Sequence, residues 1–254
     1  CYDFIMQKLI VGNWKLYIRT LEEGKKLLKA IDKKMPRGVK SVVVVCPPVA
    51  LAGALRREYK GKRIAFGTQD TFWETEGAFT GQVSATHLAS AGISYVLVGH
   101  SERRALGDTD EMVAKKAVSA ISAKLHPIIC VGETERDSDG KFFSVIEKSV
   151  KASLARIEPK DAGKFTVAYE PVWAIGKTEA ASPRVAAEAI LYIRKTIADM
   201  WGREKAMKVR IIYGASVDAE NAALFKEEKS IHGLLPGRAS TDAEEFTNII
   251  RAFS

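Results

Sequence analysis

Cysteine is scarce in this chain of 254 residues, which contains only Cys1, Cys46 and Cys130. Their odd number and the lack of any paired spacing argue against a disulfide framework and against a zinc site. We therefore expect a reduced protein that binds no metal and lacks the cross-links of small secreted domains.

Long apolar runs are missing as well. The longest, such as residues 41–45 and 95–98, have the length of a strand and fall far short of the roughly 20 residues that cross a membrane. The first eight residues carry the acidic Asp3 and have neither the basic start nor the apolar run of a secretory signal. These absences predict a soluble, cytoplasmic protein without a membrane partner. Residues 1–7 are interpreted as an extension, native or artificial, ahead of one domain at 8–254.

Charge of one sign is in excess, because 39 basic and 31 acidic residues give a net charge of +8. Many of the lysines lie on one predicted helix, at residues 20–34, where acidic residues alternate with them. No aromatic residues are interleaved with these charges, as a groove for single-stranded nucleic acid would require. The pattern indicates a solvated helix face and no nucleic-acid partner.

Short β-branched or apolar runs recur along the chain, and helical patterns separate them. The clearest helical stripe contains Ala186, Ile190, Ile193 and Ile197, and helix starts are predicted at Thr20, Ser182 and Thr241. The runs lie at residues 9–11, 42–45, 64–66, 95–98, 128–131, 166–168, 209–213 and 234–235. About eight strand–helix pairs without a dividing linker predict an α/β protein with a single (β/α)₈ barrel. The competing doubly wound sheet would have a Gly-rich turn after the first strand, where this chain has Gly12-Asn13-Trp14-Lys15.

Polar residues follow several of the predicted strands, at the end of a barrel where active sites lie. The residues that would share one mouth are Asn13, Lys15, His100, Ser101, Glu102, Glu170, Ser216, Gly237 and Arg238. His100 precedes a predicted helical turn, whose dipole would disfavour the cation and leave a neutral ring that donates to a carbonyl oxygen. Glu170 ends a buried strand, where an unpaired carboxylate is costly. For both residues a purely structural role is the alternative.

Glycine and serine at three strand ends predict a phosphate site. Main-chain N–H groups around Gly176, Ser216 and Gly237 would hold the phosphate, as loops after the last strands of a barrel commonly do. The stretch from Pro171 to Gly176 is stiff, then apolar, then flexible, which suits a loop that closes over a substrate and excludes water.

Four motifs resemble the triose-phosphate isomerase family, in the family's order: residues 12–15 (GNWK), 98–104 (VGHSERR), 168–176 (AYEPVWAIG) and 213–217 (YGASV). The resemblance implies a (β/α)₈ barrel, normally a homodimer, that interconverts dihydroxyacetone phosphate and D-glyceraldehyde 3-phosphate without a cofactor. It further implies that Glu170 is the base, His100 the electrophile, Asn13 and Lys15 the oxyanion and phosphate-side partners, and Glu102 the carboxylate that positions Lys15.

The resemblance also implies a lid and a dimer loop. The lid would comprise Trp173, Ala174, Ile175, Lys177, Thr178, Glu179 and Ala180. The segment 69–82 is similar to the family's interdigitating loop, and its Thr80 would reach Asn13 and Lys15 of a partner subunit. Exposure of its aromatic residues on a monomer would be unfavourable, which supports the expectation of a homodimer.

The chain departs from the family's pattern at four places. Residues 177–181 differ from the usual lid tip, Ala215 replaces a glycine, Arg238 follows Gly237 where a second glycine is usual, and Gln82 stands where a glutamate usually faces Arg103. Two of these changes lie at the phosphate end, so an erythrulose-phosphate isomerase of the same family is an alternative to the triose-phosphate enzyme. A non-catalytic barrel that binds a partner is a remoter alternative, because every catalytic position is filled.

Overall fold

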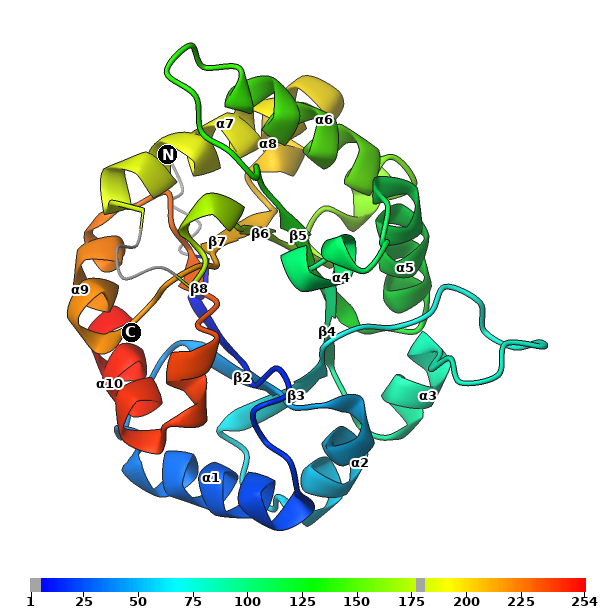
Figure 1. Cartoon of the computed structure of the whole chain (residues 1–254), viewed down its shortest axis with the longest axis vertical. Helices are drawn as coiled ribbons and strands as arrows, with labels where there is room; N and C mark the ends of the chain where they lie inside the picture. Colours follow the sequence, from blue (N-terminus) through cyan, green and yellow to red (C-terminus); the bar gives the residue numbers. More distant parts are fainter. Residues whose placement is uncertain (1–5, 177–180) are drawn as a thin grey trace.

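Eight parallel strands close into a barrel, in the order in which they occur along the chain (Figure 1). The computed structural model describes residues 6–176 and 181–254. The strands are β1 (Leu9–Asn13), β2 (Val42–Cys46), β3 (Ile64–Thr68), β4 (Tyr95–Val98), β5 (His126–Val131), β6 (Thr166–Tyr169), β7 (Arg210–Tyr213) and β8 (Gly233–Leu234). Pairing of β1 with β8 completes the ring and confirms the predicted (β/α)₈ barrel.

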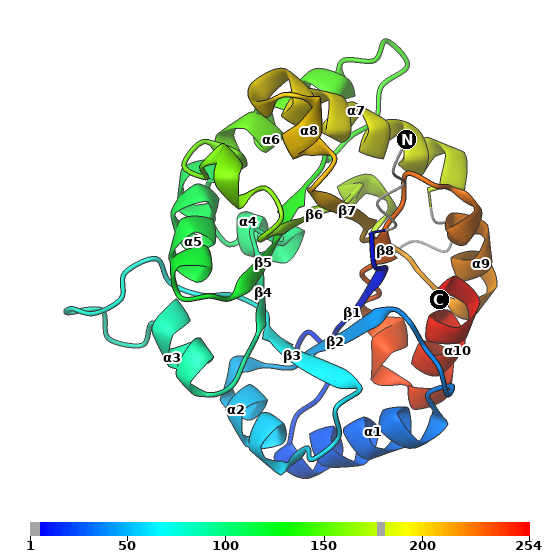
Figure 2. The same cartoon turned by 180° about the vertical axis from the view of Figure 1, so that it is seen from behind.

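Helices surround the strands on the outside, and the two views along the barrel show them as one continuous outer ring (Figures 1 and 2). The helices are α1 (Leu21–Lys34), α2 (Val49–Glu58), α3 (Ala85–Ser90), α4 (Ser101–Ala105), α5 (Asp110–Ser122), α6 (Phe142–Leu154), α7 (Pro183–Trp201), α8 (Arg203–Ala206), α9 (Ala219–Glu227) and α10 (Ala243–Phe253). Three short 3₁₀ turns accompany them: η1 (Pro159–Asp161), η2 (Val172–Ala174) and η3 (Arg238–Thr241). Within the two described ranges, no helix is long and apolar enough to span a membrane.

The strands are apolar on both faces because each face packs against a different layer. Leu9, Val11, Ile128 and Ile212 belong to a small buried cluster formed by alternate strand positions, which fills the barrel interior. The intervening positions, such as Ile10, pack outward against the helices in a much larger cluster. Polar side chains therefore have room mainly at the two ends of the barrel.

Most predicted helix starts are present, and one is shifted. Thr20 accepts a hydrogen bond from the Glu23 N–H, and Ser182 caps α7. The prediction of Thr241 as the cap of the last helix is wrong, because Asp242 accepts from the backbone N–H groups of both residues that follow Ala243. A carboxylate that satisfies two unpaired donors at a helix start outcompetes one hydroxyl.

Two histidines near the strand starts are buried in their neutral form. Burial, together with the nearby charge of Arg210 for His126 and of Arg194 for His232, lowers the pKa of each of these histidines to about 4. In the unfolded chain, both rings therefore bind a proton at a higher pH than they do in the folded barrel.

We expect the free energy of unfolding to fall as the pH drops from about 6.5 to about 4, since the unfolded state binds more protons over that window. Each histidine contributes a loss on the order of 2–3 kcal/mol at the acid end. Urea denaturation at pH 7 and at pH 4.5 checks this, with His232→Asn and His126→Asn losing less stability between the two conditions than the unmodified chain. An equal loss in all three proteins contradicts the prediction.

Candidate active site

The carboxyl ends of the strands surround a cavity of about 430 Å³. Its lining brings together most of the residues predicted to share one mouth: Asn13, Lys15, His100, Glu170, Ser216, Gly237 and Arg238. Ser101 and Glu102, which were predicted with them, are not part of this lining. These residues come from loops after five different strands, and only the closed barrel makes them neighbours.

His100 sits at the start of α4 and lines this cavity. Its Nδ1 accepts a hydrogen bond from the Glu102 N–H at 3.2 Å, in the position of a helix N-cap. A ring nitrogen that accepts carries no proton, so the proton of the neutral imidazole resides on Nε2. Nε2 lies 3.5 Å from Oε1 of Glu170, and the side chain is 8% exposed. The ring thus presents a hydrogen-bond donor next to the predicted base.

Glu170 follows β6 and is 3% exposed. Its Oε2 accepts a hydrogen bond from the Ser101 N–H at 3.0 Å, while Oε1 faces His100. The backbone of the neighbouring strand end comes very close, because a Cβ on Gly132 would lie 1.9 Å from the carbonyl oxygen of Glu170. Only glycine fits at position 132, so the sequence allows the Glu170 carboxylate to sit at the barrel rim.

Lys15 is held at both its backbone and its ammonium group. Its φ of 47° lies in the left-handed region, and its N–H donates to Oδ1 of Asn13 at 3.1 Å. Nζ binds Oε1 of Glu102 at 2.7 Å, which is the pairing predicted from the sequence. Gln69 donates through Nε2 to the carbonyl oxygens of Lys15 and Cys46, at 2.8 and 3.0 Å. Sequence reasoning assigned Gln69 only to the projecting loop, although its place directly after β3 was a signal.

The four residues predicted to bind phosphate, Gly176, Ser216, Gly237 and Arg238, line the cavity together. Gly176 has a φ of 72°, which favours glycine, and Ser216 donates through Oγ to the Ala174 carbonyl at 3.0 Å. Arg238 is exposed overall but also lines the cavity, and its guanidinium lies over the ring of Tyr17 with 5.9 Å between the guanidinium carbon and the ring centroid. A cation is therefore placed where a second glycine was expected.

The family model described as triosephosphate isomerase matches residues 8–253. The chain belongs to the triosephosphate isomerase family. It is 43% identical to the triosephosphate isomerase of Caldanaerobacter subterraneus subsp. tengcongensis over 95% of this chain and 98% of that protein. It is 42% identical to the enzyme of Thermoanaerobacter sp. strain X514, with the same coverage, and 43% identical to that of Endomicrobium trichonymphae over 96% and 97%.

In this member of the triosephosphate isomerase family, the start of the predicted lid is anchored to a buried carboxylate. Glu133 is 1% exposed, and its Oε1 accepts hydrogen bonds from Trp173 Nε1 and from the Tyr169 hydroxyl, both at 2.8 Å. Burial raises the pKa of Glu133. Sequence reasoning missed this residue, since its partners are 36 and 40 positions away.

The rest of the predicted lid is divided between described and undescribed residues. Ala174 is buried, and Ile175 lines the cavity. Lys177, Thr178, Glu179 and Ala180 lie outside the described residues.

The predicted dimer loop projects away from the barrel between β3 and α3 (Figure 1). Its aromatic rings pack on one another, with Phe72 4.1 Å from Trp73 and 5.0 Å from Phe79 between centroids. Phe79 is 44% exposed, and Thr80 is exposed beside it. Within one chain Thr80 is not part of the cavity lining.

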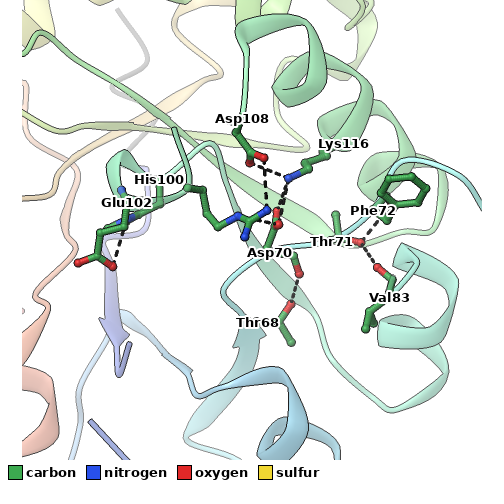
Figure 3. A network of polar contacts seen from close by, with 10 residues as sticks. Thr68, Asp70, Thr71, Phe72, Val83, His100, Glu102, Asp108 and Lys116 are labelled. Carbon is green, nitrogen blue, oxygen red and sulfur yellow. Dashed lines mark hydrogen bonds and ion pairs between the residues drawn. The ribbon is translucent and has the colours of Figure 1, made fainter. Parts of the chain in front are cut away.

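A buried ion network fastens the base of this loop to α4 and α5 (Figure 3). Lys116, 2% exposed, binds Asp70 at 2.8 Å and Asp108 at 2.6 Å. Arg103 binds the same two carboxylates, at 3.0 and 3.4 Å. Within one chain Arg103 is therefore already paired, whereas the sequence suggested Gln82 as the residue that faces it.

Replacement of Lys116 by Met should lower the free energy of unfolding by about 3–5 kcal/mol, because the buried carboxylate of Asp108 and the partly buried one of Asp70 then share one cation. Lys115→Met is the matched control, since Lys115 forms a partly exposed pair with Glu111 on the same helix and should cost less than about 1 kcal/mol. Urea denaturation at one fixed protein concentration checks both variants. Equal losses would show that the network does not stabilise the fold.

Proposed function

We propose that this chain is a triose-phosphate isomerase that interconverts dihydroxyacetone phosphate and D-glyceraldehyde 3-phosphate through an enediolate. The observation that carries the proposal is the pairing of a buried carboxylate, Glu170, with the protonated Nε2 of His100 at 3.5 Å on the wall of one polar cavity. Membership of the triosephosphate isomerase family supports it, as does the presence of Lys15 in the same cavity.

In the proposed reaction the carboxylate of Glu170 removes a proton from the carbon beside the substrate carbonyl. The Nε2–H of His100 donates a hydrogen bond to the carbonyl oxygen, and the ammonium of Lys15 stabilises the negative charge that develops there. A proton then returns from Glu170 to the neighbouring carbon, while the hydroxyl proton passes from one oxygen to the other through Nε2 of His100, so that aldose and ketose interconvert without a cofactor. The roles of Glu and neutral His are those long established for this family, and they are carried over to this chain by position.

The phosphate group would bind at the opposite side of the cavity. Backbone N–H groups around Gly176, Ser216 and Gly237, together with the Arg238 guanidinium, supply donors and positive charge there. Ala215, beside this site, has fewer accessible backbone conformations than a glycine at the same position would have. Closure of the lid, with Trp173 held by Glu133 at its start, would keep water from the enediolate.

We propose that the chain forms a homodimer and that it is located in the cytoplasm. The projecting loop 69–82 exposes an aromatic residue, Phe79, and two copies of the chain could cover it while bringing the partner's Thr80 toward Lys15. Cys46 and Cys130 are both free and buried in the barrel, which suits a reducing compartment.

Replacement of Glu170 by Asp should lower kcat by at least about 100-fold with little change in KM, because retraction of the carboxylate weakens proton transfer in the transition state. Steady-state kinetics in both directions measure this. Glu111→Asp, the same exchange on the exposed face of α5, is the control and should leave kcat unchanged. An unaffected kcat in the Glu170 variant would falsify the assignment of the base.

The identity of the substrate can be tested through Arg238. We expect kcat/KM to be higher for the triose phosphates than for the four-carbon erythrulose phosphates. Arg238→Gly should lower kcat/KM for the triose phosphates by about 5- to 20-fold, as expected for loss of one charge-assisted contact with phosphate. Preference for an erythrulose phosphate, abolished by Arg238→Gly, would instead assign the chain to the four-carbon substrate.

A further inference from the structure

A second cavity, of about 550 Å³, opens at the end of the barrel opposite to the active-site mouth. Its walls include the first residues of two strands, His126 of β5 and Arg210 of β7, together with Phe165 just before β6. In Figure 2, which views the barrel from behind, α8 lies on the outer rim near β6 and β7. We call this space the basal cavity.

The walls of the basal cavity are largely apolar. Phe165 is buried, Met207 is 56% exposed, and both line the cavity together with Met6. His126 adds no charge near neutral pH, because burial lowers its pKa to about 4 and its Nε2 is within 2.8 Å of the Thr166 hydroxyl. A ligand in this space would exchange water for apolar contacts on most of its surface.

One positive charge in this cavity has no carboxylate partner among the described residues. Arg210 donates through Nε to the Gln7 carbonyl at 3.0 Å, and no described acceptor binds its two Nη groups. The carboxylate that lines the cavity, Glu204, is bound by Lys208 at 2.8 Å instead. Burial lowers the pKa of Arg210, which is the expected result of removing a guanidinium from water without pairing it.

The combination of apolar walls and one unpaired guanidinium selects a particular kind of ligand. A neutral apolar molecule would leave the Nη groups without acceptors, and inorganic phosphate would leave the walls uncovered. We propose that the basal cavity binds small amphipathic anions, whose carboxylate or sulfonate pairs with Arg210 while the apolar body packs against Phe165 and Met207. This site is separate from the proposed catalytic mouth and does not depend on the isomerase assignment.

The probe for the test is 8-anilinonaphthalene-1-sulfonate, an aromatic anion that becomes fluorescent in apolar surroundings. Titration of the full chain should show one saturable site per chain. Arg210→Gln should weaken binding by about tenfold or more, which corresponds to about 1.4 kcal/mol. Arg57→Gln, which removes the same charge from a depression beside α2, is the matched control and should leave the affinity unchanged.

A second variant distinguishes loss of a binding contact from an effect of the Arg210 substitution on folding. Met207→Glu alters an exposed wall residue, keeps the guanidinium, and should also weaken binding by about tenfold through charge repulsion and loss of apolar contact. All three variants should keep the isomerase kcat/KM of the unmodified chain, because none of these residues lines the catalytic cavity. The neutral analogue N-phenyl-1-naphthylamine should bind at least about fivefold more weakly than the sulfonate.

Several outcomes overturn the proposal. Displacement of the probe by dihydroxyacetone phosphate places it at the catalytic mouth, and undiminished binding to both variants places it elsewhere on the surface. Equal affinity for the neutral analogue would show that Arg210 does not contribute to binding of the anion. Binding to a chain that begins at Met6 but not to the full chain assigns the cavity to residues 1–5 of the protein itself.

Discussion

Burial of every strand on both faces is the constraint on which the rest of this structure depends. The barrel interior is filled by alternate apolar side chains and the outer faces of the strands are covered by helices, so the charged side chains of the strands are confined to the two ends of the barrel. One end collects Glu170, His100 and Lys15 in the catalytic cavity. The other collects His126 and Arg210. The same packing rule therefore generates both cavities, although only one has groups suited to proton transfer.

The two ends differ in how their charges are paired. At the catalytic end, Lys15 binds Glu102, and the network beneath the projecting loop gives Lys116 two carboxylates. These ion pairs fix the position of both lysine side chains. At the basal end, Arg210 has no described carboxylate, and Arg194 donates to the backbone carbonyls of Ala206 and Val209. Partly buried cations without counter-ions are unfavourable, which is the reason that an anion is the ligand proposed for the basal cavity.

Two backbone N–H groups orient the proposed base and the histidine beside it. The Glu102 N–H directs the lone pair of His100 Nδ1 toward the helix start and so leaves its Nε2–H for the cavity. The Ser101 N–H holds one carboxylate oxygen of Glu170, while the other stays near the histidine. One short turn, residues 101–102, thus sets the tautomer of His100 and the position of the Glu170 carboxylate. In the proposed reaction, proton transfer and oxyanion stabilisation both depend on that turn.

Local sequence determined much of this protein. The apolar runs and the helical stripe of α7 predicted eight parallel strands in one barrel, because strands buried on both faces are apolar throughout. Polar residues directly after a strand, such as His100 and Glu170, marked the mouth, since in a parallel barrel all strands end on the same rim.

Only the tertiary structure decided which residues hold the side chains around the mouth in position. Gln69, Glu133 and Asp70 look like ordinary loop residues in the sequence, yet they hold Lys15, Trp173 and Lys116 across 54, 40 and 46 positions of chain. The unpaired state of Arg210 was equally hidden, because pairing depends on which carboxylates the fold brings within reach. Periodicity and strand ends are properties of neighbouring residues, whereas hydrogen bonds and ion pairs between loops arise only when the barrel closes.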